Sequence, residues 1–178
     1  ADAAVSVYAA DLDNDGDVDV LSASFNDDTI AWYENDGAFP PSFTRRVITS
    51  TANGAYDVYA ADLNRDGHLD VISASFNDDT IAWYENDGTS SPSFLEWTIT
   101  ATQDRANSVI AGDLDNDGNL DVVAAAYFDN TIVWFENQGF APSYIPDFAI
   151  SRTITTGQNR PQSVYAIDLD NDGDVDLL

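Results

Sequence analysis

Apolar residues occur in short runs along the chain, and polar turns separate these runs. Four runs in the first fifty residues are rich in Val, Ile, Ala, Tyr and Trp. This composition is typical of β-strands, and no stretch shows the 3.6-residue apolar spacing of an amphipathic helix. We therefore predict an all-β protein whose helices are absent or single turns. The first predicted strands span residues 6–10, 18–24, 29–34 and 45–49.

The same set of runs recurs along the chain. Residues 22–37 are identical to residues 73–88, and residues 124–139 are a diverged third copy in the same frame. Four short antiparallel strands in a period of about 50 residues are typical of a β-propeller blade, which buries its faces by stacking on neighbouring blades. We predict one propeller-type domain with complete blades at residues 1–50, 51–100 and 101–156 and an incomplete blade at 157–178. The residues predicted to pack between blades are Ile30, Trp32, Trp83 and Trp134.

The fourth copy ends at Leu177-Leu178, which corresponds to the middle of the second strand of a blade. A propeller needs roughly four to eight blades, so this chain does not close a ring by itself. Three arrangements are open: an excerpt of a longer protein, two copies that pool their blades, or an open array of repeats. The excerpt is the favoured interpretation, because folding units are not normally delimited within a strand.

Each repeat also carries a nine-residue loop in which oxygen-bearing side chains alternate with other residues and glycine is sixth. Calcium takes six to eight oxygen ligands at about 2.3–2.6 Å, and the glycine allows the loop to turn around the ion. We predict about one Ca²⁺ per repeat, up to four. The predicted side-chain ligands are Asp11, Asp13, Asp15 and Asp19; Asp62, Asn64, Asp66 and Asp70; Asp113, Asp115, Asp117 and Asp121; and Asp168, Asp170, Asp172 and Asp176. The seventh residue of each loop is predicted to offer its backbone carbonyl: Asp17, His68, Asn119 and Asp174.

Other readings of these loops are weaker. An EF-hand places a bidentate Glu at its twelfth position between two helices, whereas Ser22, Ser73 and Ala124 occupy that position here. Magnesium demands a strict octahedron and retains its waters, so it fits less well. Acidic turns without an ion are the remaining alternative. The second loop has one carboxylate fewer and contains Arg65, so we predict that it binds weakest.

The charge of the chain restricts its partners. The net charge is −26, from 32 acidic and 6 basic residues, and 17 of the acids are Asp within the four loops. No basic patch is present to bind nucleic acid. Cysteine is absent, and no apolar run is long enough for a membrane span. The first residues lack a signal peptide and an initiator Met, which suggests a processed or excerpted chain. Weak calcium sites fill only where calcium is near millimolar, so we expect an extracellular or cell-surface location.

Residues for catalysis are scarce. Without Cys there is no thiol nucleophile, and the single histidine, His68, lies within a metal loop. Two carboxylates could serve glycoside hydrolysis, but Glu34, Glu85 and Glu136 recur once per repeat, as a structural feature would. Glu96 alone breaks that pattern. We therefore expect a protein that is not an enzyme.

The Asp-rich loop at the start of a strand-rich repeat resembles the FG-GAP/VCBS repeat family, and Gly139-Phe140-Ala141-Pro142 loosely matches that family's Gly-Ala-Pro segment. The family includes the integrin α-subunit propeller and lectin-like propellers of fungi and bacteria. The resemblance implies calcium held between the first and second strands of each blade, and commonly seven blades in a ring.

Two non-catalytic functions follow, with a polysaccharide-active enzyme domain as a less favoured third. The preferred hypothesis is a structural or adhesion module that calcium makes rigid. Its partners would be other protein chains or further copies of the repeat, as in a fibre or larger assembly. The alternative, which the resemblance allows, is a lectin that binds glycans between blades through exposed Tyr33, Tyr84 and Phe135. The exposure of these three aromatic side chains distinguishes the two.

Overall fold

The computed structural model describes residues 1–139, 146–170 and 172–178. The Phe140–Pro142 part of the segment that resembles a family motif lies outside these residues. The described chain contains strands and turns but no helix, which confirms the all-β prediction. Within the described residues, there is no helix that is long and apolar enough to cross a membrane.

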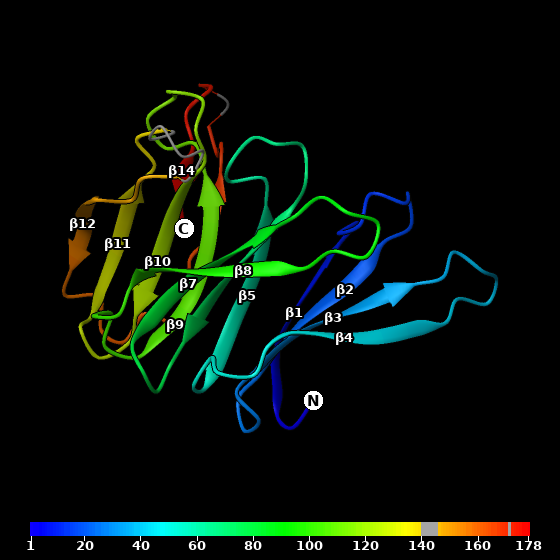
Figure 1. Ribbon diagram of the computed structural model, residues 1–178. Coiled ribbons are helices and arrows are strands. Elements are labelled where there is room, and N and C mark those ends of the chain that lie inside the picture. The colour runs from blue at the N-terminus through cyan, green and yellow to red at the C-terminus, as the bar shows by residue number, and fades with distance from the viewer. Residues whose placement is uncertain (140–145, 171) are drawn as a thin grey trace.

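The strands form three four-stranded antiparallel sheets and a small two-stranded sheet, each with its strands in chain order (Figure 1). The first sheet comprises β1 (Ala4–Ala10), β2 (Asp19–Ser24), β3 (Thr29–Asn35) and β4 (Phe43–Thr49); the second comprises β5 (Ala55–Ala61), β6 (Asp70–Ser75), β7 (Thr80–Asn86) and β8 (Phe94–Thr100). The third comprises β9 (Ala106–Gly112), β10 (Asp121–Ala126), β11 (Thr131–Glu136) and β12 (Ile150–Thr156); the fourth comprises β13 (Ala166–Ile167) and β14 (Asp176–Leu177). This is the architecture of propeller blades, three complete and one partial, that do not close into a ring (Figure 1).

The first repeat shows why the predicted strand boundaries were close but not identical. β1 begins at Ala4, two residues earlier than predicted, because Ala4 pairs with Ser24 across an irregularity in the register. β4 begins at Phe43, which pairs with Asn35 at the end of β3. These extensions depend on cross-strand partners, which a single run of residues does not specify.

The hydrophobic core lies between the sheets. Leu12, Leu21 and Trp32 of the first sheet pack against Val58 and Tyr84 of the second in one buried cluster. A matching cluster joins the second and third sheets. Each sheet thus buries its apolar faces only by stacking on its neighbours, as the repeat pattern predicted.

The tryptophan prediction is correct at two of its three repeats. Trp32 and Trp83 are buried between sheets. Trp134 is only partly buried, since the two-stranded fourth sheet does not extend far enough outward to cover it. The guanidinium of Arg152 lies over its ring instead, 4.8 Å from the centroid.

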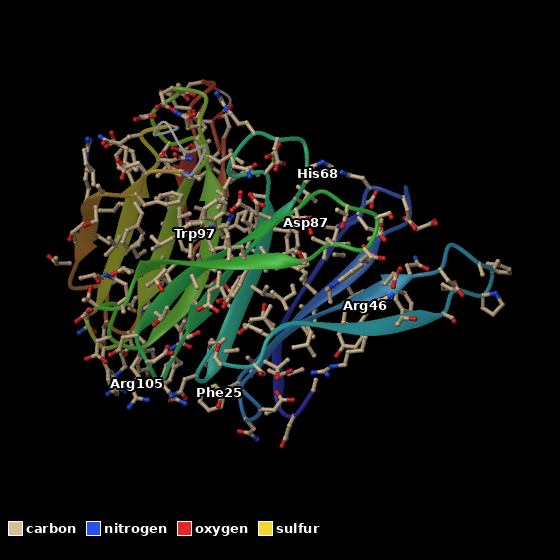
Figure 2. All side chains as sticks on the ribbon, in the orientation of Figure 1. Phe25, Arg46, His68, Asp87, Trp97 and Arg105 are labelled. Carbon is tan, nitrogen blue, oxygen red and sulfur yellow. The ribbon has the colours of Figure 1, made fainter. Side chains whose placement is uncertain are left out.

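The two ends of the sheets differ in chemistry. The loops that join the first and second strands of each sheet lie at one end, where Figure 2 labels His68. The opposite end carries a row of aromatic side chains that begins at Phe25 and continues through Tyr56, Phe76 and Tyr127. The guanidinium of Arg105, also labelled at this end, lies 4.8 Å from the centre of the Phe76 ring (Figure 2).

Candidate metal centre

The Asp-rich loops connect β1 to β2, β5 to β6, β9 to β10 and β13 to β14, and all lie at the upper end of the sheets in Figure 1. A short loop between two paired strands holds its ends together, because Ala10 pairs with Asp19 at the end of the first ladder. The first and ninth positions of the loop are thereby brought close in space.

Backbone amides fix the carboxylates of the first loop. Asp11 accepts hydrogen bonds from the amides of Asp15 and Gly16 at 3.2 and 3.0 Å. Asp13 accepts from Asp15 at 3.3 Å, and Asp15 accepts from Asp17 at 2.9 Å. Gly16 has a φ of +96°, a conformation that other residues rarely adopt. The sixth position therefore requires glycine to close this turn.

The other three loops repeat this pattern. In each, the first-position side chain accepts from the amides of positions five and six, the third from position five, and the fifth from position seven. The corresponding glycines, Gly67, Gly118 and Gly173, all have positive φ. The four loops are thus one structure formed four times.

The ninth-position Asp lies at the base of each loop. Asp70 is fully buried and accepts hydrogen bonds from the amides of Leu63 and Asn86 at 3.2 and 2.9 Å. Burial raises the pKa of the Asp70 carboxyl to about 7, and the charge of Asp66 adds to this increase. Burial likewise raises the pKa of Asp121 to about 6. A cation beside these carboxylates would favour their charged form.

Three loops bring carboxylates together in groups able to hold a metal ion. The oxygens within each group lie within 4.8 Å of one another, and the groups are Asp11, Asp13 and Asp15; Asp113, Asp115 and Asp121; and Asp168, Asp170 and Asp176. Within the described chain no such group forms in the second loop. There Asn64 replaces the third-position Asp and donates a hydrogen bond to Asp66 at 3.1 Å. The weaker binding of the second loop stays a prediction, which this residue difference motivates.

The sequence places Arg65 within the second loop, but its side chain contacts the third loop. Its guanidinium lies against the third loop, so that a Cβ on Gly118 would be 2.5 Å from Arg65 Nη2. The backbone at Arg65 has a φ of +60°, like that of Asn14 and Asn116 at the same loop position. The weakness predicted for the second loop therefore rests on Asn64 rather than on Arg65.

The seventh-position side chains make different contacts in the different loops. The His68 ring packs against Gly88 in the turn after β7, where an added Cβ would lie 2.5 Å from the ring. Asn119 lies near Gly139 and donates a hydrogen bond to Asp117 of its own loop at 2.9 Å, and Asp174 accepts a hydrogen bond from Asn116 of the preceding loop. The backbone carbonyl at this position stays the predicted ligand.

Neighbouring loops also touch each other. The Asn14 side-chain amide donates to Gly67 O at 3.3 Å and contacts His68 Nδ1 at 2.8 Å. Asn116 makes the corresponding contact with the fourth loop. The loops therefore form a continuous row, with the residue at position four of one loop contacting the next loop.

Three asparagines that support the loops were not identified as functional from the sequence. Asn86 is buried, and its side-chain amide donates to the carbonyls of Leu69 and Leu12 at 2.9 Å each. Leu69 belongs to its own loop, whereas Leu12 belongs to the preceding one. Asn137 repeats both contacts one blade later, and Asn35 lies at the same position in the first repeat. Their signal in the sequence is the repeated Asn-x-Gly, which by itself predicts only a turn.

The donor set fits a hard dication. Every predicted side-chain ligand is a carboxylate or amide oxygen, and calcium prefers such ligands. In three of the loops the carboxylates face one another at short range, which costs energy unless a cation lies between them. Burial and the neighbouring charges of Asp15 and Asp19 raise the pKa of Asp13. The predicted residues are therefore compatible with bound calcium.

Comparison with known families gives matches over nearly the whole chain. Residues 11–73, 62–124 and 119–178 each match the FG-GAP-like repeat. The chain belongs to the FG-GAP-like repeat family. Each of the first two matches runs from one Asp-rich loop into the strand that follows the next loop, so each covers one period of the observed structure together with the next loop. No curated individual protein matches the chain. Proteins of the FG-GAP-like family are generally structural or adhesive rather than catalytic.

The recurring glutamates of the FG-GAP-like repeats have structural partners. Glu34 forms an ion pair with Arg46 at 2.6 Å on the neighbouring strand, and Glu136 pairs with Arg152. Glu85 accepts a hydrogen bond from Trp97 Nε1 at 3.0 Å. These contacts link the third and fourth strands of each sheet.

The aromatic residues proposed for a lectin site are mostly buried. Tyr84 and Phe135 lie in the cores between sheets, and only Tyr33, on the open side of the first sheet, is partly exposed. The lectin alternative required these three side chains to be exposed, and this was wrong for Tyr84 and Phe135. Strand alternation directs Tyr84 and Phe135 onto the neighbouring sheet, which covers them.

Proposed function

We propose that this chain is a calcium-binding, non-catalytic module with a structural or adhesive role, in which calcium makes the blades rigid. The observation that carries the proposal is the fourfold repetition of one loop with the same amide-to-carboxylate hydrogen bonds. An acidic turn that served only solubility would not need the same internal geometry four times.

The calcium ions would stabilise the folded chain. Each loop joins the first two strands of a sheet, and each carries carboxylates that repel one another without a cation. Four calcium ions would change the net charge from −26 to −18. An ion that binds only the folded form at about 100 times its dissociation constant adds about 2.7 kcal/mol of stability.

The ligands and the charge support an extracellular setting. Sites of this kind in extracellular modules bind calcium at roughly 0.1–1 mM, a range that intracellular calcium does not reach. The partners would be other protein chains or further copies of the repeat. The buried positions of Tyr84 and Phe135 remove the argument that favoured glycans.

Thermal unfolding with millimolar calcium and with a chelator tests this proposal. We expect calcium to raise the midpoint, and calorimetric titration to show sites of unequal affinity, the second loop binding weakest. Asp115→Asn gives the third loop the ligand set of the second, so it should weaken one site and leave the others unchanged.

The matched control is Asp104→Asn, an exposed carboxylate outside the loops, which should bind calcium like the parent protein. The same midpoint with calcium and with chelator, together with no heat of binding, would refute the calcium proposal.

A further inference from the structure

The end of the sheets opposite the Asp-rich loops carries a row of aromatic side chains, here called the aromatic row. Its members are Phe25, Tyr56, Phe76, Tyr127 and Phe128, and neighbouring ring centroids lie 5.2–6.1 Å apart. Phe128 is 48% exposed, and the other four side chains are half-buried. Phe76 keeps this exposure although a sheet packs on each side of its own sheet. The stacking of sheets therefore does not cover the aromatic row.

Two arginines lie on this row. The guanidinium of Arg105 lies over the rings of Phe76 and Phe128, at 4.8 and 5.3 Å from their centroids. The guanidinium of Arg160 lies 5.5 Å from the centroid of the Tyr127 ring. Figure 2 shows Arg105 at the lower edge of the molecule, far from His68 at the loop end. Because the face of an aromatic ring attracts a cation, the rings hold both guanidinium groups at this end of the sheets.

These two guanidinium groups have no carboxylate partner in the described chain. Arg46 and Arg152, on outer strands, each form an ion pair with a Glu of the neighbouring strand, whereas Arg105 and Arg160 form none within the described residues. In the same part of the chain, the Arg105 guanidinium makes one hydrogen bond, to Asn77 Oδ1 at 3.4 Å. The chain has 32 acidic and 6 basic residues, so carboxylates are abundant. An arginine that pairs with none of them can accept a carboxylate from another molecule.

The third repeat departs from the second at both members of this contact. Arg105 occupies the position of Gly54, and Phe128 occupies the position of Asn77. The backbone φ is +67° at Gly54 and +60° at Arg105, and it is +56° at Arg160 in the fourth repeat. Glycine adopts this conformation without cost, but other residues disfavour it. Two successive repeats therefore carry arginine where the backbone favours glycine, which points to a role for the side chain.

The surrounding charges decide which kind of anion fits. Asp78, Asp79, Asp104 and Asp129 lie in turns at the same end of the sheets, and Asp79 accepts the backbone amide of Arg105 at 3.0 Å. These aspartates would repel nucleic acid, a sulfated polysaccharide or an anionic membrane, each of which presents many charges at once. A single carboxylate brings no further negative charge against them.

The geometry of arginine favours a carboxylate in particular. The planar guanidinium can bind both oxygens of a carboxylate through two parallel hydrogen bonds. The aromatic row beside Arg105 offers contacts to apolar side chains, and aromatic and Arg residues dominate the energetics of protein interfaces. An isolated carboxylate among apolar groups is the chemistry of a Glu or Asp in a protein segment.

We infer that Arg105 binds an isolated Glu or Asp carboxylate of a partner protein, while the aromatic row contacts the apolar side chains beside that carboxylate. Arg160, one repeat further along the row, offers a second guanidinium to the same segment. The inference rests on the proposed structural or adhesive module and names the chemistry of its partner. The Asp-rich loops lie at the other end of the sheets, so the partner carboxylate does not compete for calcium (Figure 1).

Titration of the 178-residue chain with a synthetic peptide, followed by nuclear magnetic resonance of the arginine Nε–H groups, tests this inference. The chain has six arginines and no lysine, so each signal is assigned by substitution. The peptide is acetylated and amidated and carries one Glu between two Tyr residues in a Gly-Ser background; the control peptide has Gln in place of Glu. We expect the Glu peptide at millimolar concentration to shift the Arg105 signal until it saturates. The signals of Arg46 and Arg152, which already pair with Glu, should not move.

The second repeat supplies the variant that removes the site with least disturbance. Arg105→Gly suits the positive φ and keeps the backbone amide that Asp79 accepts, so it should fold like the parent. It should weaken peptide binding at least about tenfold, because it removes charged hydrogen bonds. Arg105→Lys keeps the charge without the planar fork, so its affinity should lie between those of the parent and Arg105→Gly. Arg45→Ala, at an exposed arginine of β4, removes the same charge and should bind like the parent.

An Arg105 signal that does not move at any peptide concentration would overturn the inference. Equal shifts with the Glu and Gln peptides would do the same, because they would show apolar contact without recognition of a carboxylate. Tighter binding to phosphatidylserine vesicles or to polygalacturonate than to the Glu peptide would refute a protein partner. If Arg105→Gly lowered the unfolding midpoint but bound the peptide like the parent, Arg105 would only join the sheets.

The calcium proposal has a separate readout, the unfolding midpoint with calcium and with chelator. A midpoint that ignores calcium, together with a saturable Arg105 shift, would refute the calcium proposal alone. A calcium-dependent midpoint without any Arg105 shift would refute the partner inference alone.

Discussion

Replacing Asn86 by Ala tests whether the loops depend on contacts between blades. The Asn86 side chain donates to the carbonyls of Leu12 and Leu69, and it accepts from the amide of Gly88 at 2.9 Å. A buried hydrogen bond contributes about 1 kcal/mol, so we expect Asn86→Ala to lower the free energy of unfolding by about 3 kcal/mol.

The first repeat provides a matched control. Asn35 makes the equivalent bonds to Val18 and Gly37, but in the described chain it donates to no preceding loop, and its side chain is only partly buried. Water replaces exposed hydrogen bonds, so Asn35→Ala should cost about 1 kcal/mol. The difference of about 2 kcal/mol reflects the bond to Leu12 and the burial of that carbonyl.

Urea unfolding at constant calcium, followed by tryptophan fluorescence, measures both variants. For a chain of this size a loss of 3 kcal/mol lowers the thermal midpoint by roughly 6–12 °C, which calorimetry records. Asn137→Ala should resemble Asn86→Ala, since it repeats the bond to the preceding loop. Equal losses for Asn35→Ala and Asn86→Ala would refute the argument that contacts between blades support the loops.

Three further outcomes are expected. Burial raises the folded-state pKa of Asp70 from 3.8 to about 7, so the folded state binds this proton more tightly than the unfolded state. Without calcium, stability should therefore fall by up to about 4 kcal/mol as pH rises from about 4 to about 7; a midpoint that rises over this interval would contradict this. Gly88→Ala should be more destabilising in urea unfolding than Gly157→Ala, because both glycines have positive φ but only Gly88 lies against the His68 ring. Trp83→Ala should cost about 3–5 kcal/mol and Trp134→Ala clearly less, since only Trp83 is fully buried; equal losses would show that the fourth sheet covers Trp134 in solution.

Much of the candidate site followed from spacing alone. Alternating Asp residues with glycine at the sixth position predicted which side chains point inward, and the structure brings carboxylates of three loops within 4.8 Å. The supporting role of Asn86 did not follow, because its acceptor on Leu12 lies 74 residues away in sequence. The position of Arg65 did not follow either, since its contact is with another loop.

The sequence by itself determined the strands, their order within a sheet and the loop chemistry. These depend on residues close together in the chain, through alternation, turn residues and the conformational freedom of glycine. The tertiary structure decided which faces are covered. Tyr33 and Tyr84 lie in identical sequence, yet only Tyr84 is fully buried, because a preceding sheet packs on it. Burial depends on neighbours in space, and for identical repeats only the position in the stack decides whether a residue is covered or exposed.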